Sequence, residues 1–417
     1  MTDFLIIVSY LLPIVLVCVM HVARLGSAFQ VSATSLLLFF YFLNNHFGLI
    51  FQLYFPDERV TLTESVFFLL CMYSCIVIFA YLCVQIALPY KTSPRLINVD
   101  SIGDSRVNNF FILALFSLCA FLLLQKIQGS ALEYFFTKGV EEAKFTRLGS
   151  KSGQIFGIKE RYFNFLFHAL DILALVILHK AFSNRSLVYW LYFTILLAIT
   201  VLWTSTNLSK GALLKPFLYV IFVYAMLRYK GVFLNRFTFI IFVFALALVS
   251  IISAQMMGAD FEVFYALERQ LIGNLLPQIY VVNHFSVDNM LLGASAPEVF
   301  SFYTHNQFVL DQWTWKAMHN WVSGPYYSAP SSFVADAHAN FNFVGVIAYS
   351  IIAFTLCRLF DTFCIKIRDD AVYSAVVVWG GLHFSYMAVT GIYNRLIDYY
   401  LLGALLVTWF YVRLRFR

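Results

Sequence analysis

The chain is dominated by apolar stretches that are each long enough to cross a membrane. A helix needs about 20 apolar residues to span roughly 30 Å of hydrocarbon. Hydrophobic residues make up 61% of the 417 residues and charged residues only 12%, which excludes an ordinary soluble domain. Eleven such stretches can be placed, near residues 4–21, 32–55, 63–89, 108–125, 162–180, 187–203, 212–227, 234–254, 339–357, 371–390 and 399–414.

We therefore predict an all-α integral membrane protein, with a single polytopic domain of about eleven transmembrane helices over residues 1–417. The stretch 32–55 is interrupted by Asn44, Asn45 and His46, and the stretch from Ala339 has a polar edge. The chain shows no internal repeat. Its first span lacks the basic flank and the cleavage site of a secretory signal.

The basic residues of the short connections predict the orientation, because Lys and Arg near span ends are retained in the cytoplasm. Alternate connections carry fifteen and three of them. The richer set comprises Arg24, Lys91, Arg95, Arg106, Lys180, Arg185, Arg228, Lys230, Arg236, Arg358, Lys366, Arg368, Arg413, Arg415 and Arg417, and the poorer set Arg59, Lys210 and Arg395. This asymmetry predicts an N-terminus outside the cytoplasm and a C-terminus inside it. The net charge of +6 then reflects topology, not nucleic-acid binding.

Two long polar loops are expected on the outer side, at 126–161 and 255–338. The first has seven basic and four acidic residues, a balance of +3, and the second has two basic and seven acidic residues, a balance of −5. Opposite charge would let the loops attract each other, although each is equally explained as a solvated surface. Glu262–Leu271 and Asp311–Trp321 resemble short amphipathic helices at a membrane surface. All seven cysteines lie in or beside predicted spans, so disulfides do not fold the loops.

The basic loop contains a candidate anion site. Gly149, Gly153 and Gly157 allow backbone N–H groups to turn toward an anion, and Arg147, Lys151 and Arg161 supply positive charge. Arginine suits phosphate because its planar group donates two hydrogen bonds at once. The alternative is a flexible basic linker.

Three further cations stand at predicted outer span ends: Lys210, Lys215 and Arg395. Lys215 alone is explained by a side chain that extends to the interface. Arg395 lies in a short outer connection and needs a compensating group, either Asp398 or a ligand phosphate.

Asp336 and His338 stand where the acidic loop meets the next span, in the segment 335–345. Each side chain can accept a proton from a hydroxyl group when its surroundings tune it. The structural alternative makes Asp336 a helix N-cap and His338 a surface residue.

No metal or cofactor is expected. His284, His305, His319 and His338 are scattered, without the spacing of metal ligands. His168 and Asp171, one turn apart within a span, are read either as a helix-packing pair or as part of a transport path.

These features resemble the Wzy-type polymerases of O-antigen and capsule repeat units and the related O-antigen ligases. Ser209-Lys210-Gly211 is similar to the family's Ser-Arg/Lys-Gly before a helix. The segment 335–345, with Pro330 upstream, is similar to Gly-Glu-x-Tyr-x-Asn-Phe-Gly-x-x-Gly. The chain departs from that pattern at Ala335 and Asn342, where Gly is usual, and at Asp336 and His338, where Glu and Tyr are usual.

The resemblance implies a metal-independent glycosyltransferase of the bacterial inner membrane. It would move a growing glycan from undecaprenyl pyrophosphate onto the next lipid-linked repeat unit at the periplasmic face. Asp336 or His338 would be the catalytic base. The cations for the pyrophosphate would be drawn from Arg147, Lys151, Arg161, Lys210, Arg269 and Arg395.

The partners implied are undecaprenyl-pyrophosphate-linked oligosaccharides and membrane lipid, with a chain-length regulator protein left open. Two other functions remain: an O-antigen ligase, and a flippase for lipid-linked oligosaccharide. A flippase usually has a repeated half and short loops, whereas this chain places 84 residues in one predicted outer loop.

Overall fold

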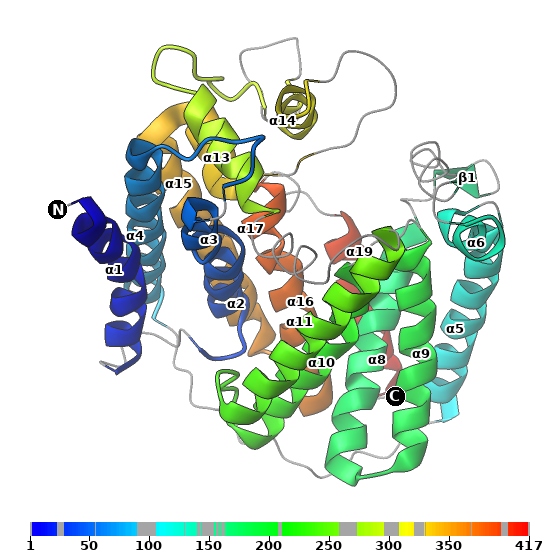
Figure 1. Ribbon diagram of the computed structural model, residues 1–417. Coiled ribbons are helices and arrows are strands. Elements are labelled where there is room, and N and C mark those ends of the chain that lie inside the picture. The colour runs from blue at the N-terminus through cyan, green and yellow to red at the C-terminus, as the bar shows by residue number, and fades with distance from the viewer. Residues whose placement is uncertain are drawn as a thin grey trace. The chain divides into compact units, whose positions relative to one another are not determined.

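The computed structural model of the protein consists almost entirely of helices (Figure 1). It describes residues 2–22, 29–54, 56–89, 106–128, 130–139, 142, 154–155, 158–159, 163–206, 211–257, 273–295, 308–320, 329, 331–367, 369–392 and 399–415. A small antiparallel pair, β1 (Gln154–Ile155) and β2 (Ile158–Lys159), has Gln154 opposite Lys159.

The helices follow in order along the chain. They are α1 (Thr2–Val22), α2 (Ala33–Tyr41), the π-helix η1 (Phe42–His46), α3 (Gly48–Tyr54), α4 (Glu64–Ala87), α5 (Arg106–Ile127), α6 (Ala131–Thr137), α8 (Asn164–Asn184), α9 (Leu187–Ser205), α10 (Gly211–Arg228), α11 (Arg236–Met257), α13 (Leu275–His284), α14 (Leu310–Met318), α15 (Phe333–Cys364), α16 (Asp370–Ser385), α17 (Met387–Thr390) and α19 (Tyr399–Arg415).

Each of the eleven predicted apolar stretches overlaps one or more helices among the described residues. Within the described residues, seven helical segments are long and apolar enough to cross a membrane, or eight if α5 and α6 form one bent span. The seven are Asp3–Val22, Ala33–Tyr54, Glu64–Ala87, Asn164–Asn184, Leu187–Ser205, Phe333–Cys364 and Asp370–Thr390. The long apolar helices expected of a membrane protein are therefore present.

The chain forms two compact units, each built from three separate stretches of sequence. Unit 1 contains Met1–Thr92, Leu267–Phe363 and Gly381–Ile397, and unit 2 contains Ser93–Ala266, Cys364–Gly380 and Asp398–Arg417.

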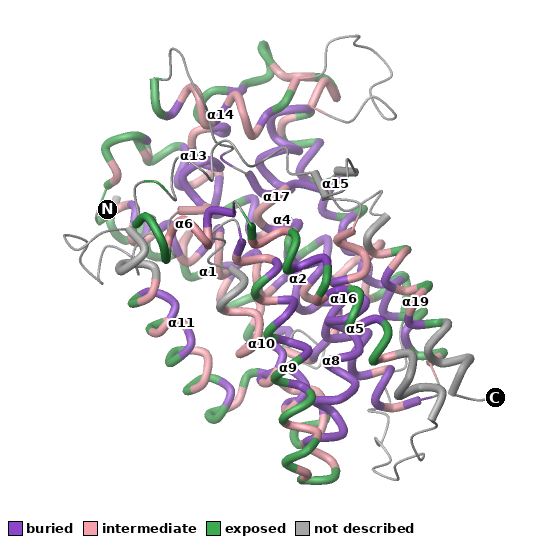
Figure 2. The backbone as a smooth tube through the Cα atoms, turned by 90° about the vertical axis from the view of Figure 1, so that its right-hand side faces the viewer, coloured by how far each residue is buried: buried purple, intermediate pink, exposed green. Residues whose placement is uncertain are grey.

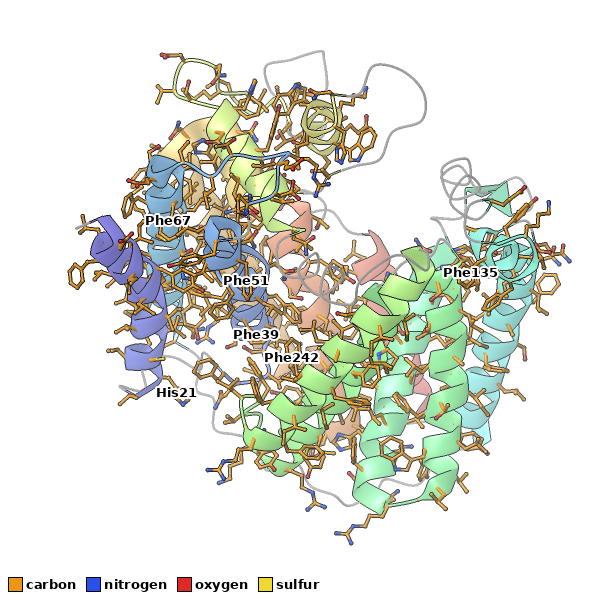
Figure 3. The ribbon with its side chains drawn as sticks, viewed as in Figure 1. His21, Phe39, Phe51, Phe67, Phe135 and Phe242 are labelled. Atoms are coloured by element: carbon orange, nitrogen blue, oxygen red, sulfur yellow. The ribbon has the colours of Figure 1, made fainter. Side chains whose placement is uncertain are left out.

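In unit 1, the predicted interruption at Asn44, Asn45 and His46 is the π-helix η1, which joins α2 to α3. His46 is buried, with Nε2 3.0 Å from the carbonyl oxygen of Tyr10 and Nδ1 3.0 Å from Ser74 Oγ. These bonds satisfy both ring nitrogens inside an apolar segment. The helices of this unit carry many aromatic side chains. Figure 3 labels Phe39 on α2, Phe51 on α3 and Phe67 on α4.

In unit 2, α8 is the central helix. Buried residues run along most of its length, whereas α9 keeps an exposed face (Figure 2). α19 approaches α8 closely at Gly403, where a Cβ would lie 2.8 Å from the Cβ of Phe165. Ser130 is the N-cap of α6, and its Oγ accepts the Glu133 N–H at 3.2 Å.

The predicted loop 255–338 contains more helix than expected. α11 extends to Met257, α14 starts one residue before the amphipathic segment predicted at 311–321 and overlaps most of it, and α13 was not foreseen. α15 begins at Phe333, six residues before the predicted span start at 339, so the polar segment is the first turns of a helix and not a loop in front of one. The other amphipathic prediction, 262–271, lies outside the described residues.

Candidate functional site

The site is built on the first turns of α15 in unit 1. Ser332 precedes the helix, and its Oγ accepts the N–H of Ala335 at 3.3 Å and donates to Gln278 Oε1 at 2.6 Å. Ser332 is therefore the capping residue of this helix. The alternative that made Asp336 the N-cap is wrong, because Asp336 lies one turn farther along and bonds elsewhere.

The carboxylate of Asp336 accepts hydrogen bonds at its Oδ1 atom. Its Oδ1 accepts the Ser295 hydroxyl at 2.7 Å and Asn340 Nδ2 at 3.2 Å, and the residue is only 6% exposed. Asn340 Nδ2 also lies 2.6 Å from Ser295 Oγ. Asp336 and Asn340 are one helical turn apart, which places both on the same face.

Asn340 has one orientation in this arrangement. Its Oδ1 accepts the backbone N–H of Gly293 at 3.0 Å, and a backbone N–H only donates, so the NH₂ group must face Asp336. The side chain is fully buried. It thus ties the carboxylate to the loop that contains Gly293 and Ser295.

The second carboxylate oxygen faces Gly391. A Cβ at this glycine would lie 3.3 Å from Asp336 Oδ2, and the glycine has φ +76, a conformation that other residues rarely adopt. In the part of the chain that the structure describes, the hydrogen bonds to this carboxylate go to Oδ1. Among the described residues, Oδ2 is therefore the carboxylate oxygen left to accept a proton.

His338 is buried and fully bonded. Its Nε2 lies 2.9 Å from the carbonyl oxygen of Phe285, and its Nδ1 lies 2.7 Å from the Tyr73 hydroxyl. Because a carbonyl only accepts, the neutral ring carries its proton on Nε2 and accepts from Tyr73 at Nδ1. The alternative of a surface residue is wrong, since His338 is 3% exposed. Among the described residues, both ring nitrogens of His338 are bonded, whereas the bonds to the Asp336 carboxylate go to one oxygen.

The helix breaks directly after these residues. Phe341 has φ −141 and ψ 17, and Asn342 has φ 52 and ψ −140, so the carbonyls before the break lose their usual partners within the helix. The N–H groups of Leu291 and Leu292 fill this gap by donating to the carbonyl oxygens of Ala339 at 2.8 Å and Asn340 at 3.0 Å. The break therefore positions the loop that carries Ser295.

The predicted phosphate-binding residues cannot be placed. Arg147, Lys151, Arg161, Lys210, Arg269 and Arg395 all lie outside the described residues. Sequence reasoning also missed Tyr73, Ser295 and Gly391. Asn340 could have been identified from the sequence, because it lies one helical turn after Asp336 within the segment 335–345.

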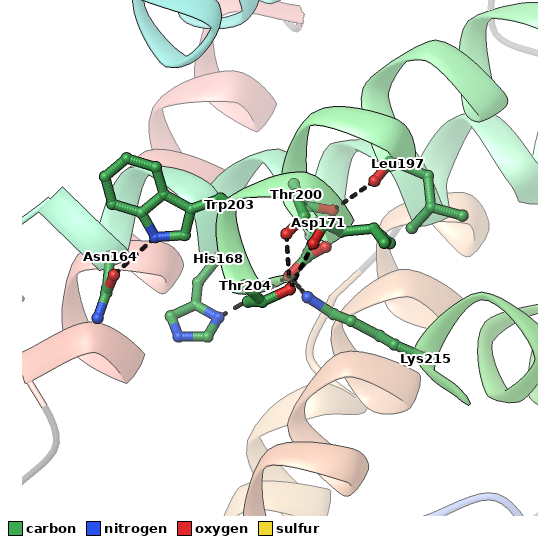
Figure 4. A network of polar contacts seen from close by, with 9 residues as sticks. Asn164, His168, Asp171, Leu197, Thr200, Trp203, Thr204 and Lys215 are labelled. Atoms are coloured by element: carbon green, nitrogen blue, oxygen red, sulfur yellow. Dashed lines mark hydrogen bonds and ion pairs between the residues drawn. The ribbon is translucent and has the colours of Figure 1, made fainter. Parts of the chain in front are cut away.

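A second polar cluster lies in unit 2. Lys215 on α10 forms an ion pair with Asp171 on α8, and His168 Nδ1 lies 3.9 Å from the same carboxylate oxygen (Figure 4). The explanation of Lys215 by extension to the interface is therefore wrong. Asp171 and His168 form part of a larger cluster and not an isolated pair.

No known protein family, curated protein or solved structure matches this chain. The function must therefore be argued from the residues and their geometry.

Proposed function

We propose that the protein is a metal-independent glycosyltransferase of the bacterial inner membrane, which polymerises undecaprenyl-pyrophosphate-linked oligosaccharide repeat units of O-antigen or capsule at the periplasmic face. The proposal includes about eleven spans, a periplasmic N-terminus and a cytoplasmic C-terminus. The observation that carries it is the Asp336 carboxylate, whose Oδ1 accepts the Ser295 hydroxyl and Asn340 Nδ2 and whose Oδ2 faces Gly391.

Three positions of the Wzy-type pattern support the resemblance through the geometry of α15. Asn340 binds Asp336, and Asn342, where the pattern has Gly, adopts the positive φ of 52 that glycine favours. Gly345, the last Gly of the pattern, lies where a Cβ would overlap the carbonyl oxygen of Ala337. These positions together build the broken helix that presents Asp336.

In the proposed reaction, a sugar hydroxyl of the incoming repeat unit attacks the anomeric carbon of the growing glycan. The new glycosidic C–O bond forms as the C–O bond to undecaprenyl pyrophosphate breaks. Asp336 Oδ2 takes the hydroxyl proton, and the pyrophosphate leaves with the electron pair of the broken bond. Cations stabilise the charge that develops on the leaving group.

The test is the glycan ladder of cells that lack the gene and are complemented with variants. Loss of a polymerase should leave the lipid A core with a single repeat unit, and wild type should restore the ladder. Asp336→Asn should not restore it, whereas Asp288→Asn, an exposed carboxylate in the same predicted loop, should.

The same gel separates the alternatives. Bare core without repeat units would indicate a ligase, and loss of lipid-linked repeats from the outer leaflet would indicate a flippase. An unchanged ladder, together with normal capsule, would reject the proposed polymerase.

The role of the cations is tested separately. Arg147→Ala, Arg161→Ala and Arg395→Ala should each abolish polymer while the protein remains in the membrane. Arg→Lys should retain part of the activity only where one point charge is sufficient. Full activity in all three alanine variants would reject these residues as the pyrophosphate site.

A further inference from the structure

The polar cluster of unit 2 joins two helices through buried charge. Asp171 is only 1% exposed and forms an ion pair with Lys215. His168, one turn before Asp171, brings Nδ1 within 3.9 Å of the same oxygen. Figure 4 shows these side chains together with Thr200 and Thr204 of α9.

Joining two helices through buried charges costs free energy. Removing two charges from water costs several kcal/mol each, and apolar residues of similar volume often replace a buried ion pair without loss of stability. Ionisable residues inside membrane helices usually mark a ligand or ion site. The cost indicates a role beyond packing.

The exposure of the three side chains is unequal. Lys215 is 19% exposed and His168 is 29% exposed, whereas Asp171 is 1% exposed. The carboxylate therefore lies behind the lysine, which can still be reached from outside the unit. An ammonium has three donors, so Lys215 can hold Asp171 and still bind a second acceptor.

The cluster lies near one end of its helices. Lys215 and His168 are each four residues after the first residue of their helix, and Asp171 is seven residues after it. At 1.5 Å per residue these positions are about 6 Å and about 10 Å from the helix starts. In the proposed topology this end is periplasmic, near the depth of lipid phosphate groups.

We propose that Lys215 binds the phosphate of an isoprenyl pyrophosphate, and that Asp171 positions the lysine and balances its charge when no ligand is bound. His168 lies near the same carboxylate oxygen and is the most exposed of the three side chains. This inference rests on the proposed function, because it assigns to unit 2 a binding site for the lipid-linked substrate. The apolar helices around the cluster suit the isoprenyl chain, and a doubly charged headgroup suits the lysine.

The competing explanation is a structural clamp between α8 and α10. A clamp predicts that removing one charge is worse than removing both, because one partner is then left buried without compensation. A binding site instead predicts that ligand binding depends on Lys215 whether or not Asp171 is present.

The experiment measures binding to the purified full-length protein in detergent. The probes are farnesyl pyrophosphate, farnesol, which lacks the phosphates, and inorganic pyrophosphate, which lacks the lipid. Farnesyl pyrophosphate should bind at least about tenfold more tightly than either control, a difference of about 1.4 kcal/mol. Equal affinity for farnesol would overturn the anion site, and equal affinity for inorganic pyrophosphate would overturn the lipid ligand.

The variants are chosen so that folding and binding are separated. Lys215→Met and the charge-free double variant Lys215→Met/Asp171→Leu should each weaken farnesyl pyrophosphate binding about tenfold or more. Asp171→Asn should bind as tightly as wild type or more tightly. Lys230→Met, which removes an exposed lysine just beyond the opposite end of α10, is the matched control and should bind normally. Normal binding by the double variant would overturn the proposal.

Failure of this inference can be distinguished from failure of the proposed function. If the deletion leaves the glycan ladder unchanged but Lys215→Met loses binding, the anion site stands and the polymerase assignment falls. If the deletion collapses the ladder but Lys215→Met binds normally, the polymerase assignment stands and the anion site falls.

Discussion

Gly345 lies so close to Ala337 that a methyl group on the glycine would overlap the alanine carbonyl oxygen. The same methyl group would lie 2.9 Å from the Cβ of Phe341. The contact exists because the helix breaks at Phe341 and Asn342, which brings the backbone of the first segment against the start of the second. The position of Asp336 depends on this break.

Gly345→Ala should therefore destabilise the protein strongly. The backbone must shift to accept the methyl group, and overpacking of this kind costs about 1–3 kcal/mol or more. The thermal unfolding midpoint of the purified protein in detergent measures this effect. Val344→Ala is the control, because that side chain is 71% exposed, and equal midpoints for the two variants would contradict the explanation.

Asn342 should tolerate glycine better than alanine. Its φ of 52 and ψ of −140 suit glycine, whereas a Cβ in such a conformation costs about 1–3 kcal/mol. Asn342→Gly loses the bond from the Phe343 N–H to Asn342 Oδ1, at 2.7 Å, but removes this strain. We expect Asn342→Gly to unfold within about 1 kcal/mol of wild type and Asn342→Ala to be less stable by at least that amount. The reverse order in unfolding midpoints would reject the prediction.

The helices were predictable because apolar residues over some 20 positions form a local signal. The start of α15 was not. Asp336, His338 and Asn340 are polar, so the sequence predicted a loop up to 338, but all three are buried within the first turns of a helix. A polar residue can be buried wherever partners satisfy it, and local patterns do not reveal distant partners.

Those partners lie far away in sequence. Tyr73, which bonds His338, is 265 residues distant, and Gly293, which bonds Asn340, is 47 residues distant. Lys215 was misread for the same reason, since its partner Asp171 is 44 residues away on another helix. The type of residue at the candidate site was predictable, but the difference in hydrogen bonding between Asp336 and His338, on which the proposed base rests, depends on tertiary contacts.

Asp311 should make stability depend on pH. Burial raises the pKa of its carboxyl from 3.8 to about 6. Because the folded state then binds the proton more tightly, the free energy of unfolding should fall as pH rises from about 4 to about 6, and the penalty persists above that range. Two pKa units correspond to roughly 3 kcal/mol as an upper value.

Asp311→Asn should remove this penalty, because an amide does not ionise. In the wild-type structure the Ser331 N–H lies 3.3 Å from Asp311 Oδ1, and the amide oxygen of Asn can still accept it. We expect the variant to be more stable than wild type by about 1–3 kcal/mol at neutral pH, and the gain to vanish below about pH 4. Unfolding midpoints across this pH range provide the measurement. Asp288→Asn, at an exposed position, should show no such change. A gain independent of pH would exclude titration of Asp311 as the cause.

Removing the Asp361 carboxylate should lower the free energy of unfolding strongly. It lies on α15, is 2% exposed, and accepts the N–H groups of Ala33 at 2.7 Å and Thr34 at 3.1 Å, together with the Thr34 hydroxyl. It thus caps the start of α2, where a negative charge also favours the helix dipole. Asp361→Ala should cost about 2–4 kcal/mol, because buried donors lose their acceptor. Asp361→Asn should cost less, since its remaining oxygen can still accept.

The thermal unfolding midpoint of the purified protein in detergent measures these losses of stability. The matched control is Thr362→Ala, the next residue, whose hydroxyl donates to the carbonyl oxygen of Arg358 one turn back, at 2.8 Å. Its loss should cost no more than about 1 kcal/mol, because no distant donor is left without an acceptor. If Asp361→Ala and Thr362→Ala unfold at the same temperature, the carboxylate does not hold α2 to α15. If Asp361→Asn is as damaging as alanine, the charge itself matters more than the number of acceptors.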